Sequence, residues 1–420
     1  MKNTVSLSLH IPEPLARPGD PVDFRGMKVP PAGAARRPDI RCSGEDTHDL
    51  AHGLIRVLNE AGEAVGPWDP KAGPEVLRRG MRAMLLVRAF DDRMYRQQRQ
   101  GKTSFYVKCT GEEAVAVAQT LALSEHDMCF PTYRQQGVLI TRGYPLVQMM
   151  HQCYSNAADP LKGRQLPVLY SARSHGFFTV SGNLGTQFSQ AVGWAMASAY
   201  KGDSRLAWSY IGDGSTAEGD FHQALLFASV YRAPVLLNIV NNQWAISAFH
   251  GIAGDEQSTF ASRGLGYGLP SLRVDGNDFL AVHAVTSWAA ERARANLGAT
   301  LIECFTYRAS AHSTSDDPNR YRSPEEGASW PLGDPIERLK SHLIRTGALT
   351  SEDAASLEAE TAEQVRKAGR EAEKIGVFGA SRPSLERMFE GVYKDKPWHL
   401  ARQEAEVLTD SAHLPAEGER

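Results

Sequence analysis

The chain has 420 residues, with 46 basic and 49 acidic side chains and a formal net charge of −3. Hydrophobic residues make up 42% and charged residues 23%, so the chain can bury a large core and is not disordered as a whole. The near-neutral charge balance argues against a nucleic-acid binder, which usually carries a basic excess.

The predicted elements divide the chain into three parts. Residues 1–70 begin with a proline-rich stretch, and we expect an arm that lies extended over another surface, because proline fixes φ and removes a backbone donor. Residues 71–335 are predicted to form one α/β domain, and residues 336–420 a charged, helical C-terminal segment. Within the first half, apolar residues at helical spacing predict helices over 74–100, 112–123 and 182–200.

The clearest pattern runs from Leu206 to Ser247. A short apolar strand at 206–211, a helix at 216–231 and a near-continuous apolar strand at 235–240 form a βαβ unit. Further strands are predicted at 272–274 and 300–305, with a helix at 279–296 between them. We therefore predict an α/β fold with a doubly wound parallel sheet and helices on both faces.

Five cysteines are dispersed along the chain without a Cys-x-x-Cys pair, which favours a reducing compartment over a disulfide framework or a zinc site. No uncharged apolar run approaches the roughly 18 to 20 residues that span a bilayer. The N-terminus has the layout of neither a signal peptide nor a mitochondrial presequence. We expect a soluble cytoplasmic enzyme that binds neither membrane nor nucleic acid.

Polar motifs follow the two strands of the βαβ unit. Gly212-Asp213-Gly214 ends the first strand and Asn241-Asn242 ends the second, so both should lie at the same edge of the sheet, where doubly wound folds bind ligands. Glycines and a helix N-terminus suit a phosphate. The side-chain oxygens of Asp213 and Asn242 are hard ligands of the kind that magnesium takes. A lone Gly-Asp-Gly is more often a tight turn, but this combination predicts a magnesium–diphosphate site.

The same arrangement matches the signature of thiamine diphosphate enzymes. The stretch GDGSTAEGDFHQALLFASVYRAPVLLNIVNNQWAIS resembles the alpha subunit of the 2-oxoacid dehydrogenases. The resemblance covers roughly residues 75 to 345 and includes SFYVKCTGEEA, FPTYRQQGVLITRGYP, KGRQLP, SGNLGTQFSQAVG and YRASAHSTSDDPNRYRS. Within the family, the HSTSDD run and the long proline-rich arm are similar to the bacterial branched-chain enzyme rather than to the pyruvate enzyme.

The resemblance implies a set of cofactor contacts. Magnesium would be held by the side chains of Asp213 and Asn242 and by the backbone carbonyl of Trp244. The residues expected at the diphosphate are Tyr133, Arg134, Gly214, Ser215 and His312. The residues expected under the aminopyrimidine are Gly182 and Leu184, with Leu184 keeping the cofactor bent. A potassium ion bound in some relatives corresponds to Ser181, Asn183, Thr186 and Gln187, although Asn183 replaces a proline found in some of them.

The expected catalytic residues are His312 and Tyr133. A histidine with a pKa near neutrality can move protons at a reacting centre. Val240 stands where some relatives carry an arginine for the diphosphate, so Arg134 and His312 would carry more of that charge. Ser313 and Ser323 match positions that are phosphorylated in mitochondrial relatives.

The function implied by the resemblance is thiamine diphosphate-dependent oxidative decarboxylation of branched-chain 2-oxoacids, with reductive acylation of a lipoyl group on an acyltransferase component. In the family, a glutamate that activates the cofactor comes from a beta subunit, and no second α/β module occurs in this chain. We therefore expect an α2β2 heterotetramer and no activity from the chain alone.

Three alternatives stay open at this point. A pyruvate or acetoin dehydrogenase alpha subunit would share the motifs and differ in the acyl pocket. A non-catalytic scaffold would have lost the magnesium ligands, which are present. A nucleotide-dependent oxidoreductase needs Gly-x-Gly-x-x-Gly after a strand, and the glycines at 264, 266 and 268 lack that spacing.

Overall fold

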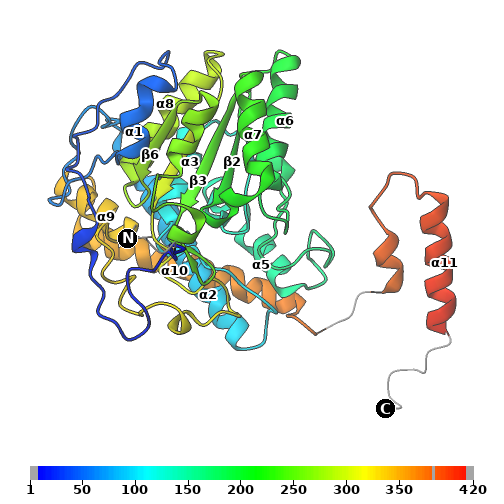
Figure 1. Ribbon diagram of the computed structural model, residues 1–420. Coiled ribbons are helices and arrows are strands. Elements are labelled where there is room, and N and C mark those ends of the chain that lie inside the picture. Colours follow the sequence, from blue (N-terminus) through cyan, green and yellow to red (C-terminus); the bar gives the residue numbers. More distant parts are fainter. Residues whose placement is uncertain (1–7, 381–383, 413–420) are drawn as a thin grey trace, which may run out of the picture.

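A computed structural model describes residues 8–380 and 384–412 of the chain (Figure 1). Its central sheet has five parallel strands in the order β1-β2-β3-β7-β6. These strands are β1 (Met128–Phe130), β2 (Ala207–Gly212), β3 (Val235–Asn241), β6 (Ser271–Asp275) and β7 (Thr300–Phe305). From β3 the chain runs to the edge strand β6 and returns as β7 beside β3, so the strand order reverses there. Such a reversal is where doubly wound folds place their ligands.

Helices cover both faces of this sheet (Figure 1). The α-helices are α1 (His48–His52), α2 (Pro74–Arg99), α3 (Glu113–Ala122), α4 (Gln136–Thr141), α5 (Leu146–Tyr154), α6 (Thr186–Tyr200), α7 (Gly219–Val230), α8 (Phe279–Arg294), α9 (Pro335–Arg345), α10 (Ser351–Ile375) and α11 (Trp398–Ala412). The 3₁₀ helices are η1 (Phe24–Gly26), η2 (Glu45–Thr47), η3 (Arg173–His175), η4 (Gly214–Ala217), η5 (His250–Ala253), η6 (Ala261–Tyr267), η7 (Pro318–Arg320) and η8 (Leu385–Phe389). A small antiparallel pair, β4 (Trp244–Ala245) and β5 (Ala248–Phe249), follows β3.

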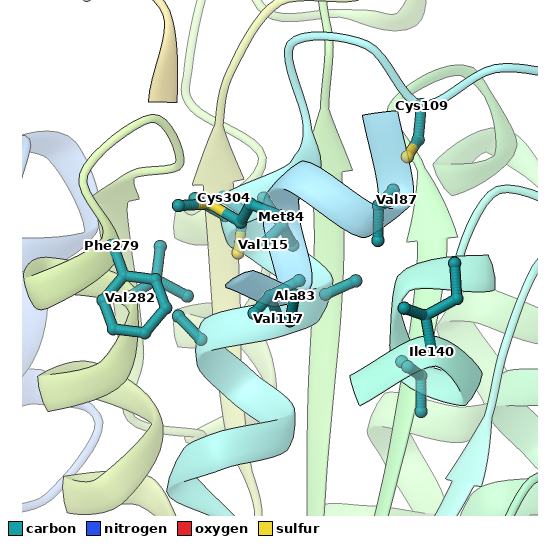
Figure 2. Close-up of a cluster of buried hydrophobic side chains, with 14 of the residues drawn as sticks. Ala83, Met84, Val87, Cys109, Val115, Val117, Ile140, Phe279, Val282 and Cys304 are labelled. Atoms are coloured by element: carbon teal, nitrogen blue, oxygen red, sulfur yellow. The ribbon is translucent and has the colours of Figure 1, made fainter. Parts of the chain in front are cut away.

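The core has two main parts, one on each face of the sheet. Because successive strand residues point to opposite faces, Trp208 and Tyr210 of β2 pack with α2, α3 and α8, whereas Ala207 and Ile211 pack with α6 and α7. Figure 2 shows part of the first face, where side chains of α2, α3, α4, α8 and β7 meet. The doubly wound α/β fold predicted from the sequence is confirmed.

The helix predictions were correct in kind and wrong at two starts. The helix predicted from residue 182 begins at Thr186, because Gly185 has a φ of +86°, which is not a helical conformation. The helix predicted from residue 216 is α7, which begins only at Gly219. The 3₁₀ helix η4 comes before it, and Glu218 between the two has an extended backbone with ψ 143°. Several short elements without clear periodicity were not predicted: α1, α4, α5, β1, β4 and β5.

The first seventy residues do not all lie on the surface as the predicted extended arm would. Ile55 and Trp68 are buried in the core of the α/β body. Ile55 forms a parallel bridge to Val274 of β6, and the carboxylate of Asp278, which caps α8, accepts backbone hydrogen bonds from Val57 and Leu58. The three-part division of the chain stays a prediction, but residues 55–68 share one core with the sheet.

The described part of the C-terminal segment contains α10, η8, α11 and nearly all of α9. Helix α10 begins with a capping box between Thr350 and Asp353, and its inner residues Val365 and Ala372 join the core beside α2 and α5. Helix α11 and η8 lie apart from the sheet in Figure 1. No helix within 8–380 and 384–412 is long and apolar enough to cross a membrane.

The five cysteines are all free. Cys109, Cys129, Cys153 and Cys304 are buried, and Cys42 is partly exposed. Burial raises the pKa of each of these five thiols.

Candidate active site

A cavity of about 510 Å³ lies at the carboxyl ends of the parallel strands. Each of four adjacent strands contributes residues just beyond its end: Tyr133 and Arg134 after β1, Asp213 to Ser215 after β2, Asn242 and Trp244 after β3, and His312 after β7. Gly182 and Leu184, from the turn before α6, complete the set. The structure therefore brings all the residues expected to bind magnesium or thiamine diphosphate into one cavity.

Asp213 is the carboxylate at the end of β2, and it is 2% exposed. Its Oδ1 accepts a hydrogen bond from the Gly214 backbone at 2.8 Å, while the buried Oδ2 has no partner within the described residues. Burial raises the pKa of Asp213 to about 6, partly offset by the Gly214 hydrogen bond and by nearby His250 and Arg308. A buried carboxylate oxygen without a partner costs free energy, and a cation would remove that cost.

The turn after β3 has a strained backbone. Gln243 and Ile246 have φ values of +74° and +55°, in the left-handed region that side chains other than glycine seldom adopt. The Gln243 amide holds the turn by donating to the Asn241 and Thr306 carbonyls at 3.1 and 3.2 Å. The Trp244 carbonyl, the expected third magnesium ligand, accepts a hydrogen bond from Arg308 at 2.8 Å. A cation at this carbonyl would share it with the guanidinium of Arg308.

Arg134 and His312 are in contact at the positive end of the cavity. Arg134 is 5% exposed, and its Nη2 donates to the His312 carbonyl at 3.0 Å and lies 3.3 Å from His312 Nδ1. Its Nη1 donates to the Lys108 carbonyl. The ring of Tyr133 meets the His312 ring edge-on, with centroids 5.8 Å apart. These contacts fix the guanidinium before any ligand arrives.

The expectation that His312 has a pKa near neutrality is wrong for this structure. Burial, and then the positive charges of Arg134 and Arg308, lower its pKa to about 3. The ring is therefore neutral, and its Nδ1 faces guanidinium nitrogens of Arg134 and Arg308 at 3.3 and 3.4 Å. Because Nδ1 accepts from these cations, the proton belongs on Nε2, which makes His312 a hydrogen-bond donor through Nε2.

Two residues of the site were not identified from the sequence. Arg308 is fully buried, and its pKa is lowered to about 10 by burial and by the neighbouring charge of Arg134. Glu112 lines the cavity at 4% exposure and accepts a hydrogen bond from Asn242 at 2.8 Å. Both lie in stretches that carried the family resemblance, GEEA and YRASAHS, but no spacing rule marks either of them as functional.

The four residues expected at a potassium site do not line this cavity. Ser181 Oγ accepts from the Asn183 backbone at 3.1 Å, and Thr186 Oγ1 donates to the Asn183 carbonyl at 3.2 Å, so three of them share a turn. The Gln187 amide instead donates to the Tyr210 carbonyl of β2 at 2.7 Å. A potassium ion at this turn stays a prediction.

The donor set fits a magnesium ion that a diphosphate accompanies. Within 8–380 and 384–412, no three histidine, cysteine or acidic side chains converge on a common metal position. One carboxylate, one amide and one carbonyl leave coordination positions for phosphate oxygens. Arg134 lines the cavity and supplies positive charge for a phosphate. A Cβ on Gly214 would come within 2.4 Å of the Ala245 side chain, so this close turn requires glycine.

The fold and the cavity together are those of an α/β protein with its candidate site at the carboxyl edge of a parallel sheet. The family model for the dehydrogenase E1 component matches residues 81–380, and the model for the N-terminal region of the 2-oxoisovalerate dehydrogenase E1 alpha subunit matches residues 5–45. The chain therefore belongs to the dehydrogenase E1 component family, among the alpha subunits of 2-oxoisovalerate dehydrogenase.

Relatives of this kind match nearly the whole chain. The 2-oxoisovalerate dehydrogenase subunit alpha of Pseudomonas aeruginosa is 58% identical over 408 residues, covering 97% of this chain and 100% of the relative. The mitochondrial subunit of Mus musculus is 38% identical over 370 residues, covering 87% and 81%. A mitochondrial subunit of Arabidopsis thaliana is 36% identical over 411 residues, covering 96% and 84%. The resemblance to the branched-chain enzyme is confirmed, and the nucleotide-dependent alternative is wrong.

Proposed function

We propose that the chain is the diphosphate-binding half of a thiamine diphosphate- and magnesium-dependent dehydrogenase that acts on branched-chain 2-oxoacids. The observation that carries the proposal is the buried Oδ2 of Asp213, which has no hydrogen-bond partner within the described residues and lies in one cavity with Asn242 and Arg134. When bound, thiamine diphosphate supplies the carbon nucleophile and the electron sink for decarboxylation. The protein supplies orientation and charge.

Each side chain of the cavity has a stated task in this proposal. Asp213, Asn242 and the Trp244 carbonyl hold magnesium, and the Gly214 and Ser215 backbone faces the diphosphate. Arg134 binds the diphosphate with geometry that other parts of the protein already fix, which lowers the reorganisation needed on binding. His312 donates a hydrogen bond through Nε2 to oxygen that becomes negative during the reaction, with Tyr133 packed against its ring.

The other half of the site is proposed to come from a beta subunit. Leu184, expected under the aminopyrimidine, is 46% exposed, which is unusual for a large apolar side chain at a binding site and suits a surface that another chain covers. We propose an α2β2 heterotetramer in the cytoplasm. Its acyl product passes to a lipoyl group on a dihydrolipoyl acyltransferase core.

The test is decarboxylation of 3-methyl-2-oxobutanoate with thiamine diphosphate, magnesium and an artificial electron acceptor. We expect activity when the chain is co-expressed with its beta subunit, none from the chain alone, and poor turnover of pyruvate. The Asp213→Ala variant of the co-expressed complex should lose both activity and magnesium-dependent cofactor binding.

Two outcomes would contradict the proposal. Activity from the chain alone would refute the shared site. An assembled, cofactor-loaded complex that turns over pyruvate faster than the branched 2-oxoacid would refute the substrate class.

A further inference from the structure

The Asn242 side chain can serve a cation only through one of its two ends. The amide oxygen Oδ1 is an acceptor, whereas Nδ2 carries two donor hydrogens and repels a metal ion. Rotation of the amide by half a turn exchanges the two ends. A magnesium site that uses Asn242 therefore needs something that selects the orientation.

Glu112 is placed to make that selection. It immediately precedes α3, is 4% exposed, and lines the cavity. Its Oε1 accepts a hydrogen bond from Asn242 Nδ2 at 2.8 Å, a good distance for a charge-assisted bond. A carboxylate accepts only from the donor end, so the bond turns Oδ1 away from Glu112. The other contact of Oδ1 is with the Trp244 backbone N–H at 3.4 Å, which is too long to fix the amide alone.

Glu112 is also an ion-pair partner of Arg134. Its Oε1 lies 3.8 Å from Arg134 Nε, while the two Nη nitrogens of Arg134 donate to the Lys108 and His312 carbonyls. The guanidinium is therefore hydrogen-bonded through both Nη nitrogens, and the Glu112 carboxylate lies near its Nε. One buried carboxylate thus touches a proposed magnesium ligand and a proposed diphosphate ligand.

We propose that Glu112 is a positioning residue that presents the Asn242 oxygen to the magnesium ion and holds Arg134 for the diphosphate. The inference rests on the proposed function, because the cation in question is the magnesium that accompanies thiamine diphosphate. Glu112 acts through its neighbours in this account and has no contact with the reacting atoms.

The first test measures magnesium binding in the complex of this chain with its beta subunit. The complex is titrated with Mg²⁺ at saturating thiamine diphosphate, and binding is followed by the rise in thermal unfolding temperature and by calorimetry. Glu112→Ala should weaken magnesium binding about 10- to 100-fold, as removal of such supporting partners typically does. Glu112→Gln keeps an acceptor oxygen of the same size for Asn242 and should recover most of the lost affinity.

A double-mutant cycle separates orientation from general damage. In Asn242→Asp, both side-chain oxygens are acceptors, so no orientation has to be selected, and the new carboxylate is next to Glu112. Adding Glu112→Ala to that variant should leave magnesium affinity unchanged or improve it. The loss of magnesium affinity caused by Glu112→Ala would then be absent or reversed in the Asn242→Asp background.

The outcomes distinguish this inference from the proposed function. If the unaltered complex binds no magnesium with thiamine diphosphate, the proposed function fails. If the unaltered complex binds both and Glu112→Ala binds magnesium equally well, only the role of Glu112 is refuted. Equal losses from Glu112→Ala in both backgrounds would show a merely structural role and would also overturn the inference.

Discussion

Asp213 combines burial, a missing hydrogen-bond partner and a pKa raised to about 6. Its carboxyl group prefers to be protonated in the folded, cation-free protein, whereas the unfolded chain has an ordinary value near 3.8. Protonated Asp213 therefore contributes to the free energy of unfolding. This contribution is fully present below the pKa of the unfolded chain and is lost as the pH rises through about 6.

This shift predicts that the stability of the protein relative to Asp213→Asn changes with pH in opposite directions with and without the cation. In the presence of a chelator, the stability of the unaltered protein relative to Asp213→Asn should fall by about 1 kcal/mol between pH 5 and pH 7. With magnesium and thiamine diphosphate present, the relative stability should instead rise over the same range, because the cation binds the ionised carboxylate. Denaturant unfolding at several pH values measures both trends, and a flat difference without the cation would refute the buried, uncompensated carboxylate.

Residues of the site differ in how far the sequence could identify them. Asp213 and Asn242 follow apolar strand segments, so their positions at the sheet edge follow from strand geometry alone. Arg134 and His312 needed the family resemblance. Glu112 and Arg308 act through contacts between segments far apart in the chain, such as the Glu112–Asn242 bond across 130 residues. No local pattern encodes such a contact.

At the level of elements, the βαβ unit and the long helices were predictable because their apolar residues are periodic. The starts of α6 and α7 were not predictable, since Gly185 and Glu218 adopt non-helical backbone conformations that helical periodicity does not record. Strand β1 is only three residues long, so its sequence has no room for a pattern. It pairs with β2, and Cys129 also bridges to Phe177. Tertiary pairing defines it.

The contact between α2 and α8 gives a prediction at this scale. Gly80 of α2 lies against the fully buried ring of Phe279, and a Cβ at position 80 would come within 2.4 Å of that ring. Gly80→Ala should therefore destabilise the fold, because overpacking costs about 1–3 kcal/mol while the gain in helix propensity is at most about 1 kcal/mol. The matched control is Gly193→Ala in α6, where nothing lies within 4 Å of the added Cβ. It should stabilise by about 0.5–1 kcal/mol. Denaturant unfolding of both variants checks the signs, and a stabilising Gly80→Ala would refute the close contact.

On the scale of the whole molecule, residues 55–68 pack in the core of the α/β body. The ring of Trp68 meets Trp288 of α8 at 6.2 Å, and its indole nitrogen donates to the Arg36 carbonyl at 2.8 Å. Composition alone indicated an extended arm, because prolines dominate its first part and the buried residues come later. Residues 55–68 pack in the same core as the sheet, so these contacts mark no boundary between an arm and a body.

Two tryptophan variants test this integration. Trp68→Ala should lower the free energy of unfolding of the α/β body by about 3–5 kcal/mol, because a large buried side chain is lost. Trp398→Ala on α11, where the side chain is 74% exposed, should change it by less than about 0.5 kcal/mol. If Trp68→Ala unfolds with unchanged stability, residues 55–68 are an independent arm after all.

The positions of the cysteines allow thiol modification to report on local unfolding of the chain. Four thiols are sealed in the interior and Cys42 alone is partly accessible, so a thiol-modifying reagent has one accessible target in the native state and five in the unfolded state. Cys109 lies beside α2 and Cys304 belongs to β7, as Figure 2 shows, whereas Cys129 lies in β1 and Cys153 in α5. The order in which these four thiols become alkylated therefore shows which parts of the molecule unfold together, without any engineered label.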